Sequence, residues 1–189
     1  MNSAHTNSSN EEHWYAMRVT YGRELKVQSA LKGKFKTYVP KCFKTVQRFG
    51  HRRYELTSAI SNLIFIYATF ESLKKMKETE KAGAQLRYIK DYKDDYLVVP
   101  LKQMEDFMRV SELPEEKLIP INITDGKKLM GQKVRIIDGE LAGVEGRIMR
   151  LQGNKKVVVN VSNLIAYAIS FVPPEWLIIN ALPTMQLTF

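Results

Sequence analysis

The sequence has no long apolar segment and only one cysteine, and both shortages exclude classes of protein. No apolar run in the 189 residues approaches the roughly 20 that a membrane-spanning helix needs. The opening stretch MNSAHTNSSNEEH lacks the basic and apolar regions of a secretory signal. Cys42 has no second cysteine with which to form an internal disulfide. We therefore expect a cytoplasmic protein that does not bind membranes.

Residue patterns that support catalysis or metal binding are also scarce. The three histidines have no cysteine or carboxylate partners at the spacing of a metal site or a catalytic triad, and there is no Gly-Lys-Ser/Thr phosphate loop. The acidic group Asp91, Asp94 and Asp95 is better explained by a turn than by a two-carboxylate centre. We expect no enzymatic activity, no metal and no cofactor.

Positive charge, by contrast, is plentiful and concentrated in the first third of the chain. The net charge is +9. Residues 1–60 hold 11 basic and 4 acidic residues (+7), residues 61–128 hold 12 of each (0), and residues 129–189 hold 6 and 4 (+2). A basic patch attracts phosphate backbones without reading sequence, although scattered lysines also occur on ordinary solvated surfaces.

The first half of the chain alternates between strand and helix patterns, with helices on one face of a mostly antiparallel sheet. The order is β-α-β-β-β-α-β-α, an α+β arrangement. The third and fourth elements are the arms of a basic hairpin around Gly50. The elements read from the sequence are HWYAMRVTY, GRELKVQSALKGK, KTYVPKCFKTVQRFGHRRYELTS, NLIFIYATF, ESLKKMKETEKAG, LRYIKDYKDDYLVVP and PLKQMEDFMRV.

The second half begins with a segment of different composition. Residues 112–128 carry Pro114, Pro120 and a Asp-Gly pair without periodicity, which favours a linker. KVRII, GRIMRL, KKVVVNV and LIAYAISFV then follow as short strands separated by Gly and Asn turns, typical of a small β-barrel. Gly139, Gly143 and Gly146 lie between the first two strands, where glycine permits positive φ or close backbone contact.

Several stretches of the sequence resemble known families. GQKVRIIDGELAGVEGRIMRL resembles the KOW motif, which opens an SH3-like barrel in ribosomal proteins and in NusG-type transcription factors. WYAMRVTYGRELKV resembles the first strand and helix of the NusG N-terminal (NGN) domain. TYGRELK, SNLIFIYAT, LRYIKDY, VVPLKQMEDFMRV and GELAGVEGRIMRLQGNKKVVVNV also resemble the UpxY paralogs of Bacteroidetes, which are operon-specific antiterminators of surface-polysaccharide operons.

The resemblance implies an α+β chain in which a ferredoxin-like NGN domain is followed by a KOW barrel. The expected boundaries are a flexible tail 1–12, the NGN domain 13–111, a linker 112–128, the KOW domain 129–180 and a C-terminal tail 181–189. A monomer is expected. In one place the chain departs from housekeeping NusG: residues 59–63, Ala-Ile-Ser-Asn-Leu, replace its Phe-Phe-Pro-Gly-Tyr segment, which puts the detailed polymerase footprint in doubt and favours the paralog.

The resemblance also implies a function in transcription elongation and antitermination. NGN domains bind the clamp helices of RNA polymerase through an apolar depression. The positions that would line it here are Trp14, Val19, Thr20, Tyr21, Ile60 and Leu63. Trp14, Ile60 and Leu63 can equally be core residues, whereas Tyr21, at a strand end, favours the interface.

The basic hairpin would then face upstream or non-template DNA, or nascent RNA. The cations expected to neutralise phosphates are Lys44, Arg48, Arg52 and Arg53, although a merely solvated hairpin is the simpler reading for any one of them. The KOW domain would recruit a second partner, which in NusG is a ribosomal protein or Rho. The basic residues of the barrel would suit RNA equally well: Arg147, Arg150, Lys155 and Lys156. The alternative to an elongation factor is a ribosome-associated KOW protein that binds structured RNA and never contacts polymerase.

Overall fold

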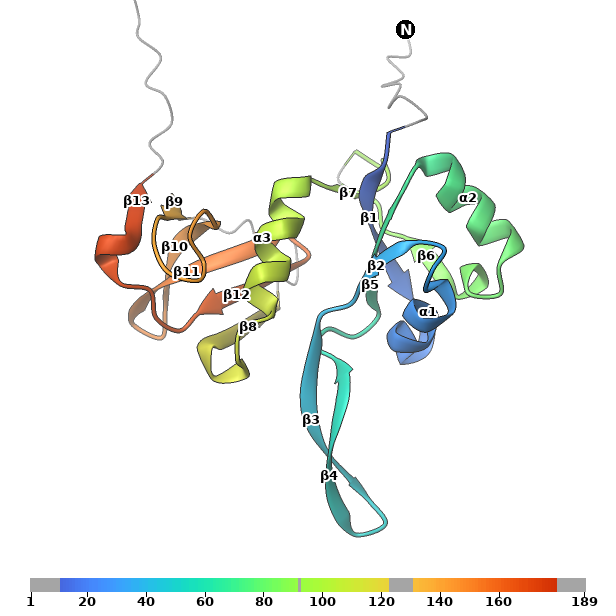
Figure 1. Cartoon of the computed structure of the whole chain (residues 1–189), viewed down its shortest axis with the longest axis horizontal. Coiled ribbons are helices and arrows are strands. Elements are labelled where there is room, and N and C mark those ends of the chain that lie inside the picture. Colours follow the sequence, from blue (N-terminus) through green and yellow to red (C-terminus); the bar gives the residue numbers. More distant parts are fainter. Residues whose placement is uncertain (1–10, 92, 123–130, 180–189) are drawn as a thin grey trace, which may run out of the picture. The chain divides into compact units, whose positions relative to one another are not determined.

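The chain divides into two compact units, Met1–Leu101 and Lys102–Phe189. The computed structural model describes residues 11–91, 93–122 and 131–179 (Figure 1). The predicted tail 181–189, nearly all of the tail 1–12 and residues 123–128 of the predicted linker lie outside the described residues. Within the described residues no helix has the length and apolar character needed to span a bilayer.

An antiparallel sheet forms the centre of the first unit, in the order β2-β5-β1-β6, with β7 also paired to β1. The almost entirely apolar segment that we expected to be a central strand is β5, which lies between β2 and β1. The strands are β1 (His13–Val19), β2 (Lys36–Tyr38), β5 (Leu63–Ala68), β6 (Leu86–Tyr88) and β7 (Val98–Val99).

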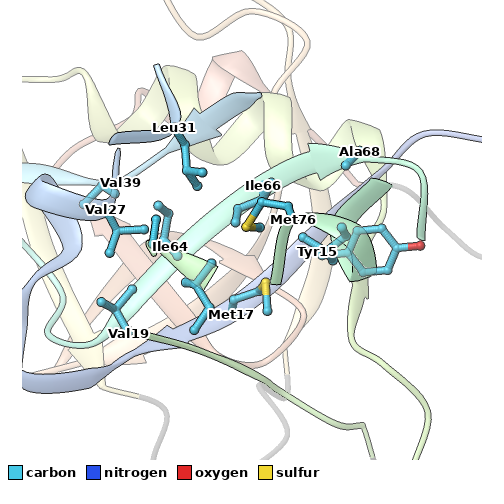
Figure 2. Close-up of a cluster of buried hydrophobic side chains, with 13 residues drawn as sticks. Tyr15, Met17, Val19, Val27, Leu31, Val39, Ile64, Ile66, Ala68 and Met76 are labelled. Atoms are coloured by element: carbon cyan, nitrogen blue, oxygen red, sulfur yellow. The ribbon is translucent and has the colours of Figure 1, made fainter. Parts of the chain in front are cut away.

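Two helices, α1 (Glu24–Leu31) and α2 (Phe70–Thr79), pack on one face of this sheet. The side chain of Thr69 caps α2 by accepting a hydrogen bond from the Ser72 N–H at 3.2 Å, which satisfies one of the free donors of the first turn. Figure 2 shows how the two helices and the strands supply one cluster of buried apolar side chains. This core includes Tyr15, Met17, Val19, Val27, Leu31, Ile64, Ile66, Leu73 and Met76.

The predicted basic hairpin is present as a separate two-stranded sheet. Strands β3 (Lys41–Arg48) and β4 (His51–Ser58) pair along their whole length and project from the main sheet of the first unit (Figure 1). The buried Pro40 separates β3 from β2, so the first arm read from the sequence consists of two strands. Short 3-10 helices, Thr20–Gly22 and Gly83–Gln85, complete the unit.

The second unit contains a six-stranded antiparallel sheet in the order β13-β9-β10-β11-β12-β8. The four strands expected from the sequence are β9 (Gln132–Ile136), β10 (Glu145–Leu151), β11 (Asn154–Val161) and β12 (Ile165–Ile169). The other strands are β8 (Leu118–Asn122) and β13 (Leu177–Ile179), and the 3-10 helices are Glu115–Lys117 and Pro174–Trp176. That these strands form an SH3-like KOW barrel remains a prediction.

Two features of this unit differ from what we expected. The segment that we interpreted as an irregular linker contains β8, which pairs with β12 from Leu118 to Asn122. The residues on both sides of Pro120 are apolar and favour a strand. Proline is tolerated there because β8 lies at the edge of the sheet. Helix α3 (Leu101–Ser111), which we expected to be the last element of the first domain, falls almost entirely within the second compact unit. Phe107 of α3 stacks on Tyr167 of β12, with 5.4 Å between the ring centroids.

Candidate functional site

The candidate polymerase contact begins where β1 leaves the sheet and turns into α1. Tyr21 occupies the left-handed region (φ 61°, ψ 36°) and Gly22 follows it at φ 61°. A bulky L-residue in this region costs about 1–2 kcal/mol, which glycine avoids. The Tyr21 ring nevertheless remains 86% exposed, so its burial does not offset the strain. Such a residue is a candidate for contact with a partner.

Side chains from neighbouring elements hold this turn in place. The Val19 N–H donates to the Asn62 carbonyl at 3.1 Å, and the Gly22 N–H donates to Asn62 Oδ1 at 3.1 Å. The Asn62 N–H in turn donates to the carboxylate of Glu24, which is only 2% exposed and lies in the first turn of α1. An acidic residue there also interacts favourably with the helix dipole. We therefore call Tyr21, Gly22, Glu24 and Asn62 the Tyr21 turn.

The six predicted polymerase-binding residues do not share one surface. Thr20 and Ile60 are partly exposed, and the Thr20 hydroxyl donates to the Gln85 carbonyl at 3.5 Å. Tyr21 is the most exposed of the six, and the Arg23 guanidinium carbon lies 5.7 Å from its ring centroid. Val19 belongs to the core beneath the helices. Trp14 and Leu63 are buried as well, at 1% and 6% exposure.

Strand register places Trp14 and Leu63 on the sheet face opposite the helices. Trp14 pairs with Tyr67 and Leu63 pairs with Arg18, while the intervening residues of β1 and β5 enter the core. The indole of Trp14 lies 5.3 Å from the Tyr67 ring, centroid to centroid, and Lys36 Nζ lies 5.6 Å from the indole. Trp14 Nε1 is buried and has no hydrogen-bond partner among the described residues.

The hairpin β3–β4 presents two faces of different chemistry. Side chains alternate between the faces of a strand, and directly paired residues share a face. One face, which we call the charged face, holds Lys44 opposite Glu55 and Val46 opposite Arg53. The other, which we call the aromatic face, holds Phe43 opposite Leu56, Thr45 opposite Tyr54, Gln47 opposite Arg52 and Lys41 opposite Ser58.

The predicted nucleic-acid contacts are therefore distributed over both faces. Lys44 and Arg53 are exposed on the charged face, and Arg52 is exposed on the aromatic face. Arg48 ends β3, and its side chain is not among those described. The side chains of a strand alternate between its two faces, and this period of two separates the cations into two groups.

Exposed apolar side chains on the hairpin are the feature that the sequence analysis did not single out. Phe43, Tyr54 and Leu56 are 60%, 79% and 47% exposed. At the tip, Phe49 is 100% exposed with φ 50°, followed by Gly50 with φ 78°. Two-residue turns of this kind favour Asn or Gly at the first position, so an aromatic residue there is unusual.

In the second unit, the loop between β9 and β10 contains the three predicted glycines. Gly139 and Gly143 have φ of 76° and 87°, which suits glycine. Gly146 lies in β10, where a Cβ atom would come within 2.8 Å of the Val158 carbonyl oxygen. These are the two reasons for glycine, positive φ and close backbone contact, that the sequence pattern predicts.

Side chains of helix α3 hydrogen-bond to backbone groups of this glycine loop. Arg109 donates to the Ala142 and Glu140 carbonyls at 2.9 and 2.8 Å, and Lys102 Nζ donates to the Gly143 carbonyl at 2.8 Å. The buried carboxylate of Asp106 accepts a hydrogen bond from the Glu145 N–H at 3.1 Å and pairs with Lys102. The loop is thus held from the side of α3.

Half of the basic residues considered for RNA binding in the second unit have internal partners. Arg147 donates to the Gly131 carbonyl at 2.9 Å, and Lys156 donates to the Ser170 carbonyl. Arg150 and Lys155 are exposed. This surface therefore offers less free positive charge than the sequence suggests.

The remaining titratable features of the first unit fit structural roles. The Asp91 carboxylate accepts hydrogen bonds from the Lys93 and Asp95 N–H groups at 2.7 and 3.1 Å, as expected for a turn. Burial, with smaller contributions from nearby Tyr96, Glu78 and Tyr15, raises the pKa of Tyr88 to about 12. Within the described residues, no group of three His, Cys, Asp or Glu side chains could hold a metal ion.

Comparison with known proteins gives one family match. The model of the family described as transcription termination factor nusG matches residues 12–108, about half of the chain. A solved structure entitled "Domain interaction in Thermotoga maritima NusG" is similar with a TM-score of 0.42 and 17% sequence identity. That match covers 84% of this chain and 93% of the other. No match was found among curated proteins.

Proposed function

The chain belongs to the NusG family of transcription factors, and from this premise we propose that the Tyr21 turn binds the clamp helices of RNA polymerase. The family acts in transcription elongation and termination, binds RNA polymerase and is not enzymatic. The exposed ring of Tyr21 would make the main contact with the clamp helices. Thr20 and Ile60, which are partly exposed, would contribute to the same contact. Trp14, Val19 and Leu63 are buried within the first unit, so the proposed contact excludes them.

One observation carries the proposal. The Tyr21 turn keeps a large aromatic side chain in solvent at a strained backbone position. The Gly22 N–H donates to Asn62 Oδ1 and the Asn62 N–H donates to the Glu24 carboxylate, and these bonds hold the turn in place. Aromatic side chains that are rigidly held and exposed are typical anchors of protein interfaces. A helical partner would bury the ring against its apolar face, with polar contacts at the rim.

We also propose that the chain is an antiterminator of the UpxY type, which promotes processive transcription of a surface-polysaccharide operon. The segments TYGRELK and SNLIFIYAT, which carry much of this resemblance, meet in space through the Gly22 N–H and the Asn62 side chain. A factor that holds the clamp closed would disfavour pausing. The hairpin cations then neutralise phosphates of upstream or non-template DNA or of nascent RNA.

The binding proposal is tested with full-length protein and core RNA polymerase. Tyr21→Asp places a charge where the apolar ring would dock, so we expect at least a tenfold loss of affinity in co-elution or fluorescence titration. Glu71→Ala, a change at an exposed position of α2, serves as the matched control. Unchanged affinity in a folded Tyr21→Asp protein, or retention by ribosomes but not by polymerase, would contradict the proposal.

The antitermination proposal is tested in cells. Run-through transcription of the neighbouring operon is measured with the wild-type gene, without it and with the Tyr21→Asp variant. We expect read-through to fall in the last two. Equal read-through in all three would exclude an operon-specific antiterminator while leaving polymerase binding intact.

A further inference from the structure

The aromatic face of the hairpin combines exposed rings with exposed cations. Phe43, Tyr54 and Leu56 lie together because Phe43 is directly opposite Leu56 and diagonal to Tyr54. Lys41 and Arg52 occupy the two ends of the same face. Across residues 41–58, 5 basic residues against 1 acidic residue give a net charge of +4. Interleaved aromatic and basic side chains are the surface chemistry of single-strand binding proteins.

We propose that the aromatic face binds single-stranded nucleic acid, with unpaired bases stacked on Tyr54 and Phe43 and the backbone phosphates neutralised by Arg52 and Lys41. The inference rests on the proposed function, which brings the hairpin to nucleic acid near the polymerase. The two faces of the hairpin would then bind different parts of the nucleic acid. The charged face attracts phosphates of any strand, whereas the aromatic face selects strands whose bases are unpaired.

The preference for a single strand follows from geometry. In a duplex, the flat faces of the bases are covered by their neighbours, so a side chain outside the helix meets only base edges and phosphates. A single strand exposes the base faces, and stacking on an aromatic side chain then becomes possible with any base. The 79% exposed ring of Tyr54 is available for such a contact.

Stabilisation of the hairpin itself explains only part of this face. An isolated two-stranded ribbon is marginally stable in water, and the cross-strand pair Phe43–Leu56 contributes to it. Tyr54, however, lies opposite the small Thr45 and leaves most of its surface in solvent. Phe49 is fully exposed at the tip, in a left-handed conformation that disfavours a large side chain. Folding alone gives no reason for aromatic rings at these two positions.

The test uses full-length protein and fluorescein-labelled oligothymidylate, oligouridylate and a DNA duplex of the same length. Tyr54→Val keeps a good strand-forming residue but removes the ring, so we expect at least a fivefold loss of affinity for the single strands and none for the duplex. Tyr54→Phe retains the ring and should bind like the wild type. Comparison of oligothymidylate with oligouridylate identifies whether DNA or RNA is preferred.

Salt dependence separates stacking from charge. Arg52→Gln should lower the slope of log K against log salt by about 0.7 on the single strand, because one phosphate contact is lost. Tyr54→Val should leave that slope unchanged. Val46→Thr, on the charged face, is the matched control and should change neither quantity.

The proposal is overturned if folded Tyr54→Val protein binds single strands as tightly as the wild type, or loses affinity for single strands and duplex by the same factor. It is also overturned if Tyr54→Val weakens polymerase binding alone, because the face would then be a protein contact. Failure of this inference leaves the effect of Tyr21→Asp on polymerase binding untouched. If the polymerase proposal is wrong, Tyr21→Asp binds polymerase as tightly as the wild type, and the oligonucleotide titrations are unaffected.

Discussion

At the scale of single residues, the most informative positions are those where folding and binding demand different side chains. Tyr21 and Phe49 both have positive φ, and both keep their rings in solvent. Glycine or asparagine would suit either backbone position better. Gly146 shows the opposite situation, since the backbone there is ordinary but Val158 leaves no space for a side chain.

Tyr21→Gly separates folding from binding. Removing the strained side chain relieves the left-handed position, while the greater freedom of glycine in the unfolded chain offsets part of the gain. We expect the free energy of unfolding to stay constant or to rise by up to about 1 kcal/mol, as measured by urea denaturation. Polymerase affinity should nevertheless fall. A large loss of stability would mean that the Tyr21 ring belongs to the fold rather than to an interface.

Gly146→Ala should destabilise the second unit. The added Cβ atom would overlap the Val158 carbonyl and the Val157 side chain, and overpacking of this kind costs about 1–3 kcal/mol. Gly153→Asn is the matched control, because Gly153 has open space around it and a φ of 82° that asparagine tolerates. Equal unfolding free energies for the two variants would show that β10 and β11 do not approach each other as closely as described.

At the scale of secondary-structure elements, α3 and the hairpin β3–β4 have the largest consequences for function. Residues 101–108 of helix α3 lie within the segment matched by the family model. The side chains of Lys102, Asp106 and Arg109 nevertheless hydrogen-bond to the glycine loop and to Glu145 of the second unit. The hairpin exposes apolar or charged side chains on both of its faces. Side chains of α3 are thus used in packing, whereas many side chains of the hairpin face solvent.

Phe107→Ala tests the attachment of α3 to the second unit. Phe107 is fully buried and stacks on Tyr167, so its truncation should lower the free energy of unfolding by about 3–5 kcal/mol. Leu101→Ala, at a 54% exposed position of the same helix, should change it by less than about 0.5 kcal/mol. If both variants unfold like the wild type, α3 does not contribute to this core.

Sequence periodicity predicted most of these elements but not how they associate. The apolar run of β5, the spacing of Leu73 and Met76 in α2 and the Gly50 turn are local signals, and the structure confirms all three. Strand β8 was not predicted, because it is only five residues long and contains Pro120, which usually argues against a strand. Its pairing with β12 is a long-range contact that the local sequence does not show. The assignment of α3 to the second unit depends on tertiary hydrogen bonds, which leave no periodic signal.

The candidate site was predictable to a similar extent. Residue types identified the turn after β1 and the cations of the hairpin. The buried state of Val19 follows from the strand alternation that also places Tyr15 and Met17 in the core. The Glu24–Asn62 hydrogen bond joins residues far apart in the sequence, so no local pattern could reveal it.

At the scale of the whole molecule, positive charge is distributed unequally along the chain. The net charge of +7 in residues 1–60 lies in the segment that contains Tyr21 and the hairpin. The second unit carries little net charge and holds several of its basic side chains in internal hydrogen bonds. Electrostatic attraction to a transcribing polymerase and its nucleic acids should therefore act mainly through the first unit.

Site-specific photocrosslinking from position 21 tests the central claim most directly. A photoreactive phenylalanine analogue replaces Tyr21 in the full chain, with the exposed Glu71 of α2 as the control position, and the protein is irradiated with a core polymerase elongation complex. The account predicts a crosslink from position 21 to the clamp helices and none from position 71. Absence of a crosslink from position 21, or the same crosslink from both positions, would contradict it.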